Sequence, residues 1–307
     1  MLDICLLGTG GMTPLPYRFL TSMIARFNGS SVLIDCGEGT QVALRKKGWS
    51  PKPVDVICFT HFHADHISGL PGFLLSMANA DRTEPVLMVG PKGLSRVVAS
   101  LRVIARDLPF VVDCIELDDK EHIINLDGMR IKAFKVSHSV PCYGYSIEID
   151  RAGRFDAEAA KALGLDVKYW SKLQKGETVT INGREYYPSM VMGEARKGLK
   201  VTYCTDSRPT HSITENARDA DLFICEGMYG DIAELEKAKD KKHMTFFEAA
   251  AMAAEAGAQR LWLTHYSPSL NHPADYLEET QKIFEKTEVC KDGTSISLVF
   301  EDEELSE

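Results

Sequence analysis

The segment Thr60-His61-Phe62-His63-Ala64-Asp65-His66 places four candidate metal ligands within six residues, directly after an apolar, strand-like run at 54–59. Side chains of an extended chain alternate between two faces, so His61 and His63 point to the same side and can bind one ion together. Asp65 and His66 follow where the chain turns into a helix, and they can serve a neighbouring ion. Three imidazoles and one carboxylate favour zinc, or manganese and iron, over magnesium and calcium.

Three further candidate ligands stand at the ends of apolar runs elsewhere in the chain, namely His138, Asp206 and His265. Any one of them alone fits a structural hydrogen-bonding residue as well as it fits a metal ligand. Three such ends beside a ready-made cluster can complete two coordination shells. The sequence therefore predicts a two-metal site built by His61, His63, Asp65, His66, His138, Asp206 and His265.

Short apolar runs bounded by turn residues dominate the first half of the chain, and helical patterns alternate with such runs in the second half. Strands are expected at 2–7, 21–27, 31–35, 54–59, 130–135, 143–149, 200–205, 222–226, 260–264 and 295–300, and helices at 40–46, 70–77, 93–104 and 245–256. Thr245 and Glu248 form a capping box at the start of the last helix. This order predicts an α/β fold, a four-layer α/β/β/α sandwich that makes residues 1–307 a single domain.

An inserted arm is expected at about 150–198, where the sequence becomes richer in Lys, Gly and Glu and holds only a short helical pattern near 157–163. Lys168, Lys172 and Lys175 give the arm positive charge that can contact phosphates. Tyr169 and Trp170 fit two interpretations equally well, stacking on a bound partner or packing inside the protein. The acidic tail from Glu301 is expected to be solvated.

Composition limits the classes of function that the chain can have. Its 307 residues carry a formal charge of -9, which argues against broad, sequence-independent binding of nucleic acid but leaves a local basic patch open. The eight cysteines occur singly, with no C-x-x-C pair, and are expected to be buried thiols. No run approaches the length of a membrane span, and the start does not resemble a signal peptide, so a cytoplasmic protein is expected.

Several motifs together resemble the ribonuclease Z family, the tRNA 3′-processing endonucleases of the metallo-β-lactamase superfamily. The resemblance runs nearly the whole length of the chain. It rests on Leu6-Leu7-Gly8-Thr9-Gly10, Asp35-Cys36-Gly37-Glu38-Gly39-Thr40-Gln41, the His61 segment with its continuation to Gly72, Val89-Gly90-Pro91-Lys92-Gly93, His138-Ser139-Val140-Pro141-Cys142-Tyr143-Gly144-Tyr145, Lys172-Leu173-Gln174-Lys175-Gly176-Glu177 and Leu263-Thr264-His265.

The resemblance implies a metallo-β-lactamase fold and two zinc ions per subunit, with Mn²⁺ or Fe²⁺ as possible substitutes. One ion would be held by His61, His63 and His138, the other by Asp65, His66 and His265, with Asp206 bridging them. A metal-activated hydroxide would attack precursor tRNA, and Asp65 would orient it or act as base. His243 matches the family's proton donor and Glu226 the acidic residue that orients it. Family members are homodimers in which the arm of one subunit serves the other's site.

The arm departs from the family pattern, which has a Gly-Pro motif before the Lys-Leu-x-x-Gly-Glu segment. Here that stretch reads Leu165-Asp166-Val167-Lys168-Tyr169-Trp170. Two functions are therefore kept: a zinc-dependent endoribonuclease that removes 3′ trailers from precursor tRNA, or a phosphodiesterase or other hydrolase of the same fold that acts on a non-tRNA substrate. A non-enzymatic metal-bound scaffold or nucleic-acid binder is the third alternative.

Overall fold

A computed structural model describes residues 1–118 and 122–301 of the chain and divides it into two compact units. The first unit comprises Met1–Glu148 and Lys200–Val299, and the second includes Ile149–Leu199. The prediction of one domain with an arm at about 150–198 remains a prediction. Among the described residues, no helix combines the length and the apolar character needed to cross a membrane.

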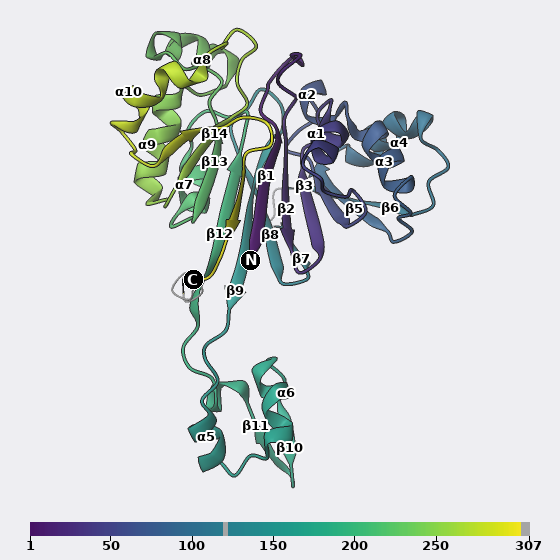
Figure 1. The fold of residues 1–307 in the computed structure, drawn as a ribbon, viewed down its shortest axis with the longest axis vertical. Coiled ribbons are helices and arrows are strands. Elements are labelled where there is room, and N and C mark those ends of the chain that lie inside the picture. Colours follow the sequence, from purple (N-terminus) through teal and green to yellow (C-terminus); the bar gives the residue numbers. More distant parts are fainter. Residues whose placement is uncertain (119–121, 302–307) are drawn as a thin grey trace. The chain divides into compact units, whose positions relative to one another are not determined.

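Two seven-stranded sheets form the centre of the first unit (Figure 1). The first sheet has the order β16 (Ser295–Leu298), β1 (Leu2–Gly8), β2 (Ser22–Phe27), β3 (Ser30–Ile34), β4 (Val54–Cys58), β5 (Val86–Pro91) and β6 (Val112–Leu117). The second has the order β15 (Thr287–Val289), β14 (Leu261–Thr264), β13 (Leu222–Glu226), β12 (Arg196–Cys204), β9 (Tyr143–Arg151), β8 (Met129–Lys135) and β7 (His122–Leu126).

Helices cover the outer face of each sheet, and this confirms the four-layer α/β/β/α sandwich of the metallo-β-lactamase type (Figure 1). The first sheet carries α1 (Thr40–Lys46), α2 (Ala64–Ile67), α3 (Leu70–Ala78) and α4 (Leu94–Leu101), and the second carries α7 (His211–Ala217), α8 (Leu235–Lys241), α9 (Phe246–Ala256) and α10 (Leu277–Gln281). The predicted helix at 93–104 is shorter than expected, because its last three residues, Arg102–Ile104, form a 3₁₀ turn.

Each sheet changes from antiparallel to parallel pairing along its order, and this change positions the site. Strands β3 to β6 run parallel, as do β12 to β15. Parallel neighbours end at the same edge, so the loops that follow them converge there. Apolar side chains fill the layers beneath, including Phe59 and Phe73 under the first set of helices and Phe223 and Phe246 under the second.

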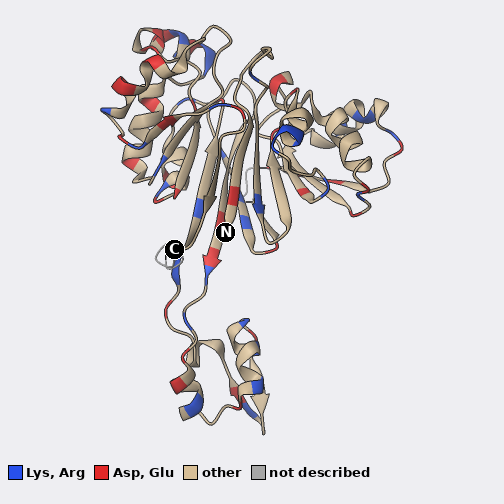
Figure 2. Cartoon of the chain, in the orientation of Figure 1, with Lys and Arg blue, Asp and Glu red and all other residues tan. Residues whose placement is uncertain are grey.

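The second unit has a small core of its own. It contains α5 (Ala157–Ala162), α6 (Trp170–Gln174) and a hairpin of β10 (Val179–Ile181) with β11 (Arg184–Tyr186). Its buried cluster consists of Ala160, Leu165, Leu173, Val179, Tyr186 and Val191. Figure 2 shows both signs of charge on this unit. The acidic tail after Glu301 lies outside the described residues.

Candidate metal centre

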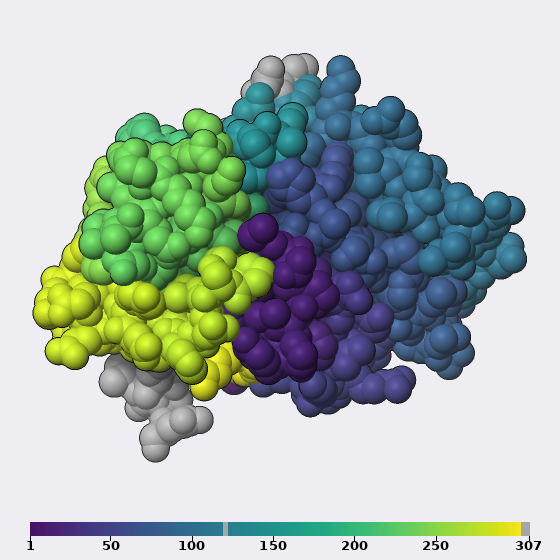
Figure 3. Space-filling model, turned by 90° about the horizontal axis from the view of Figure 1, so that it is seen from above, coloured from purple at the N-terminus to yellow at the C-terminus, as the bar shows by residue number. Residues whose placement is uncertain are grey.

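The seven predicted ligands lie together, because the segments that carry them follow strands that end at the same edge. His61 and His63 follow β4, and Asp65 and His66 belong to the short helix α2 that comes next. The other three residues follow strands of the second sheet, His138 after β8, Asp206 after β12 and His265 after β14. Figure 3 looks down on this edge, where the N-terminal segment meets segments from both halves of the sequence.

The backbone is held in an uncommon conformation at two of these strand ends and at a third one nearby. Asp206 has a φ of 45° and His265 a φ of 57°, and Asp35, which follows β3, has a φ of 58°. Residues other than glycine rarely adopt this left-handed backbone conformation, because it costs free energy. Where they do adopt it, they cluster at functional sites.

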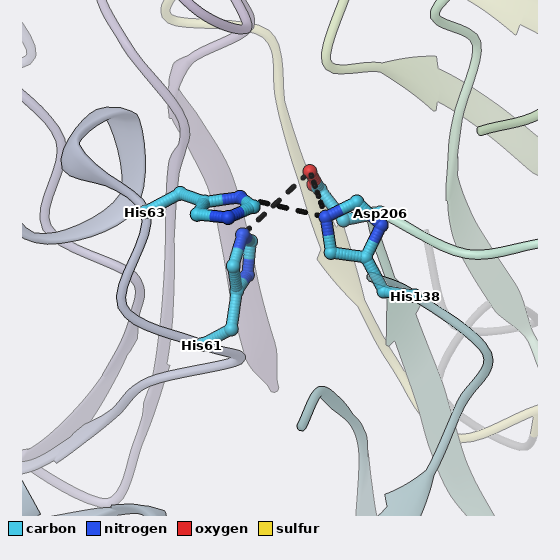
Figure 4. A group of neighbouring side chains, drawn as sticks. All are labelled: His61, His63, His138 and Asp206. Atoms are coloured by element: carbon cyan, nitrogen blue, oxygen red, sulfur yellow. Dashed lines mark hydrogen bonds and ion pairs between the residues drawn. The ribbon is translucent and has the colours of Figure 1, made fainter. Parts of the chain in front are cut away.

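The first ligand group consists of His61, His63 and His138 around one oxygen of Asp206 (Figure 4). The Nε2 atoms of His61 and His138 each lie 3.7 Å from Asp206 Oδ2. Nε2 of His138 lies 3.4 Å from Nδ1 of His63. Side chains from both sheets therefore point toward one small volume.

The second ligand group consists of Asp65, His66 and His265. The Nε2 atoms of His66 and His265 lie 3.1 Å from each other and 3.1 Å from Asp206 Oδ1. Asp65 Oδ2 lies 3.7 Å from His66 Nε2 and 3.5 Å from His265 Nε2. Asp206 thus faces the first group with one carboxylate oxygen and the second group with the other.

These positions fit a divalent cation in each group. Zinc bound by nitrogen at about 2.0–2.1 Å in tetrahedral geometry separates its ligand atoms by about 3.3–3.4 Å, close to the separations of 3.1 to 3.7 Å between the ligand atoms here. His61 Nε2 is buried and has no hydrogen-bond partner among the described residues. A buried polar atom without a partner is costly, and an ion would supply the missing interaction. The imidazole and carboxylate donors suit zinc, manganese or iron.

Electrostatics favour the metal-binding form of two of the ligands, Asp206 and His61. Burial acts to raise the pKa of Asp206, but the imidazoles of His265, His66 and His61 lower it well below the ordinary carboxyl range. Burial, together with the neighbouring His66, lowers the pKa of His61 well below its usual value. Ligands must be deprotonated to bind metal. An ionised Asp206 and a neutral His61 are therefore in the binding form at neutral pH.

Four hydrogen bonds support the ligands, and the sequence patterns did not predict them. The carboxylate of Asp35 accepts hydrogen bonds from Thr60 N–H at 2.8 Å and from His66 Nδ1 at 2.8 Å. Met12 N–H donates to Asp65 Oδ2 at 2.6 Å, and His138 Nδ1 donates to the carbonyl oxygen of Lys242 at 3.1 Å. The signal that the sequence offered for Asp35 is its position at the end of a strand, the same position that Asp206 has.

His243 and Glu226 form a pair beside the two ligand groups. His243 Nδ1 lies 3.0 Å from Glu226 Oε2, and Glu226 is fully buried at the end of β13. Ser207 N–H donates to the other Glu226 oxygen at 2.6 Å. Burial acts to lower the pKa of His243, but the Glu226 carboxylate raises it to about 9. The pair is therefore suited to hold a proton on the imidazole at neutral pH.

A pocket of about 460 Å³ opens onto this centre. Its lining includes six of the predicted site residues, His63, Asp65, His138, Asp206, His243 and His265, together with side chains from helix α8 and the loop 267–269. Ligand atoms from both groups therefore border one space that a substrate can enter.

The predicted substrate-binding residues of the arm, Lys168, Tyr169, Lys172 and Lys175, all lie in the second unit. The three lysines are exposed, and Lys168 pairs with Asp166 at 3.4 Å. Tyr169 and Trp170 pack partly against the small core, and Trp170 Nε1 donates to the carbonyl oxygen of Leu165. Packing inside the protein thus accounts for much of both rings.

Comparisons with solved structures identify the fold. Human tRNase Z, short form, gives a TM-score of 0.69 at 24% identity, covering 97% of this chain and 100% of that chain. The metallo-β-lactamase fold protein YhfI from Bacillus subtilis gives a TM-score of 0.68 at 18% identity, covering 96% and 98% of the two chains. The chain is thus a protein of the metallo-β-lactamase fold with a candidate His/Asp metal centre.

Sequence comparisons narrow this class to a family. A family model described as "Anti-Pycsar protein Apyc1" matches residues 2–162. Ribonuclease Z of Lachnospira eligens is 60% identical over 303 residues, which is 99% of this chain and 100% of that protein. Ribonuclease Z of Agathobacter rectalis is 55% identical over 303 residues, with the same coverage. The chain belongs to the ribonuclease Z family.

Proposed function

We propose that the protein is a divalent-metal-dependent endoribonuclease that removes 3′ trailers from precursor tRNA. The observation that carries the proposal is the convergence of seven His and Asp side chains in a chain with full-length similarity to proteins named ribonuclease Z. Two zinc ions per subunit are proposed, with Mn²⁺ or Fe²⁺ as substitutes. His61, His63 and His138 would hold one ion, Asp65, His66 and His265 the other, and Asp206 both.

Bound cations of this kind lower the pKa of water and neutralise charge on phosphate oxygens. Asp65, held by Met12 N–H, orients the attacking water and accepts its proton. As the new bond from water to phosphorus forms, the bond from phosphorus to the O3′ oxygen of the tRNA breaks. Protonated His243 donates its Nε2 proton to that oxygen, because its Nδ1 is engaged by Glu226. The products are a tRNA with a 3′-hydroxyl and a trailer with a 5′-phosphate.

Lys168, Tyr169, Lys172 and Lys175 are proposed to contact tRNA, and the exposure and positive charge of the three lysines support this. A homodimer, in which the arm of one subunit serves the site of the other, is proposed from the family resemblance.

A cytoplasmic location is proposed as well. It is supported by the eight free cysteines, of which only Cys114 is not buried.

The decisive experiment incubates the pure zinc-loaded protein with a precursor tRNA and maps the cleaved end. We expect one cut that leaves a 3′-hydroxyl on the tRNA, and none with His63→Ala. Hydrolysis of bis-p-nitrophenyl phosphate without cleavage of precursor tRNA would instead support the alternative, a phosphodiesterase for non-tRNA substrates. Loss of turnover in a folded His63→Ala variant would exclude a non-catalytic scaffold.

Subunit exchange tests the dimer. A variant without its arm is mixed with His63→Ala, which retains the arm but has an impaired site. Each variant alone should be inactive on precursor tRNA, and the mixture should recover activity if the arm acts on the partner's site. Sedimentation that shows only monomers at assay concentrations would contradict the proposal.

A further inference from the structure

Helix α8 supplies the positive charge of the pocket that opens onto the metal centre. Among the described residues that line this pocket, Lys237 and Lys241 are the only Lys or Arg side chains. They are four residues apart on α8, which places them on one face of the helix about 6 Å apart along its axis. The helix ends two residues before His243. One side of the pocket therefore carries two cations next to the histidine of the proposed proton transfer.

Each lysine has one acidic neighbour, and Lys237 also lies over the ring of Tyr229. Lys237 Nζ lies 3.0 Å from Glu234 Oε1 and 4.6 Å from the centre of the Tyr229 ring, and its side chain is 50% exposed. Lys241 Nζ lies 3.0 Å from Asp240 Oδ2. Solvent-exposed ion pairs are worth only about 0.2–1 kcal/mol. A phosphate group can therefore replace either carboxylate at little cost.

The rest of the pocket carries negative charge, which these two lysines offset. Asp65 and Asp206 line it, and the whole chain has a formal charge of -9. An RNA strand brings further negative charge, and its phosphates bind lysine by releasing counterions. Bound metal ions act on the phosphate that reacts, whereas the phosphates beside it need cations from the protein.

We propose that Lys237 and Lys241 are substrate-positioning residues that contact backbone phosphates of the RNA next to the cleaved bond. This inference rests on the proposed function, because it concerns the same site and the same class of substrate. The contacts are to the backbone, so they are independent of base sequence. They act on RNA binding more than on the chemical step.

The test compares Lys237→Gln/Lys241→Gln with Lys239→Gln/Lys282→Gln, which has the same net charge. Lys239 is a matched control, since it lies on α8, is 50% exposed and pairs with Glu236 three residues earlier, but it does not line the pocket. Lys282 lies at the end of α10 and pairs in the same way with Glu279, three residues earlier. Affinity of the zinc-loaded protein for a fluorescent precursor tRNA with a non-cleavable linkage at the processing site is measured by anisotropy at several salt concentrations.

Loss of two phosphate contacts should reduce the slope of log affinity against log salt by about 1.4 and weaken binding about 25-fold at 0.1 M salt. With zinc, KM for precursor tRNA should rise more than kcat falls. The control pair should retain the wild-type slope, and Lys237→Arg/Lys241→Arg should restore it. Circular dichroism checks that all variants are folded.

Two results would overturn the inference, and they can be told apart. If wild-type protein cleaves precursor tRNA and the pocket variant keeps the slope and KM of the control, the lysine contact is wrong and the proposed function stands. If wild-type protein neither binds nor cleaves precursor tRNA, the proposed function fails and this inference fails with it.

Discussion

Asp35 illustrates how a side chain outside the pocket can govern the metal centre. It is fully buried, accepts from Thr60 and from His66 Nδ1, and so fixes the ring nitrogen that faces Asp206. Residues that orient a metal-binding histidine in this way typically contribute a factor of 10–100 in metal affinity. Its importance comes from the ring orientation it imposes.

Replacing Asp35 by Asn should therefore weaken zinc binding about 10- to 100-fold while the protein stays folded. The amide has no charge to favour the Nδ1–H form of His66. Competition with a coloured chelator measures the affinity. Asp55→Asn is the control, since Asp55 lies on β4 and pairs with Arg82 away from the centre. Equal zinc affinity in the two variants would refute the role assigned to Asp35.

The pair of His243 and Glu226 predicts a pH effect in metal-free protein. The pKa of His243 is raised to about 9 by Glu226, so the charged form is favoured in the folded state. Its stabilising contribution is fully present below about pH 6.5, the unfolded value, and is lost as pH rises through about 9. Glu226→Gln should lower the pKa measured by NMR and should destabilise metal-free protein more at pH 6 than at pH 10. An unchanged His243 pKa in this variant would contradict the assignment.

Among the elements, helix α9 shows how local sequence holds the site in place. Thr245 caps it in a complete capping box with Glu248, and Gly257 ends it with a φ of 65°. His243 lies just before this cap, and Glu248 also pairs with Arg208. The start of α9 thus fixes the segment that carries the proposed proton donor.

Thr245→Ala should lower the free energy of unfolding by about 1–2 kcal/mol, because the cap and its buried hydroxyl are both lost. Urea denaturation of the zinc-free protein measures this change. Thr210→Ala provides a comparison, since Thr210 caps α7 through one longer bond of 3.4 Å and should cost less. A larger loss for Thr210→Ala would show that the capping box is not the source of stability.

The sequence patterns predicted many of the elements with strong local signals, but strand β5 (Val86–Pro91) was missed although its sequence is apolar throughout. The strand before His61 and the capped helix α9 were both predicted, because one has an apolar run and the other a capping box. Strand β6 was missed, since its alternating pattern contains Asp113 and Glu116. Helix α8 was missed because its sequence is mostly charged, and the lysines of the pocket were missed with it.

For the whole molecule, the metal centre joins segments from both halves of the sequence. The cluster from His61 to His66 and three strand ends predicted the seven ligands, but the packing of two sheets determines which nitrogen and oxygen atoms face each other. That pairing depends on contacts far apart in the sequence, such as His66 with His265, and no local pattern encodes it. Ions bound there would link the two sheets.

Metal removal should therefore lower the melting temperature of the protein. Binding of an ion to the folded state alone stabilises it by about 2.7 kcal/mol at a free concentration 100 times its Kd. Calorimetry with and without EDTA measures the shift, which should grow with zinc concentration. Asp206→Ala should abolish the dependence on zinc, because Asp206 faces both ligand groups. A melting temperature of wild-type protein that is independent of zinc would count against ions in this centre.

The division into two units predicts that the arm can be removed without loss of the main fold. Its buried cluster is made only of residues between Ala160 and Val191, so replacement of residues 153–194 by a short Gly/Ser linker exposes little of the larger core. We expect the shortened protein to fold, bind zinc and hydrolyse bis-p-nitrophenyl phosphate, but to lose cleavage of precursor tRNA.

The matched variant Lys168→Gln/Lys172→Gln/Lys175→Gln retains the arm and should lose part of that cleavage, because only the exposed charge is removed. Unchanged processing of precursor tRNA by both variants would mean that the arm does not contact the substrate, and recognition would then rest on the pocket alone.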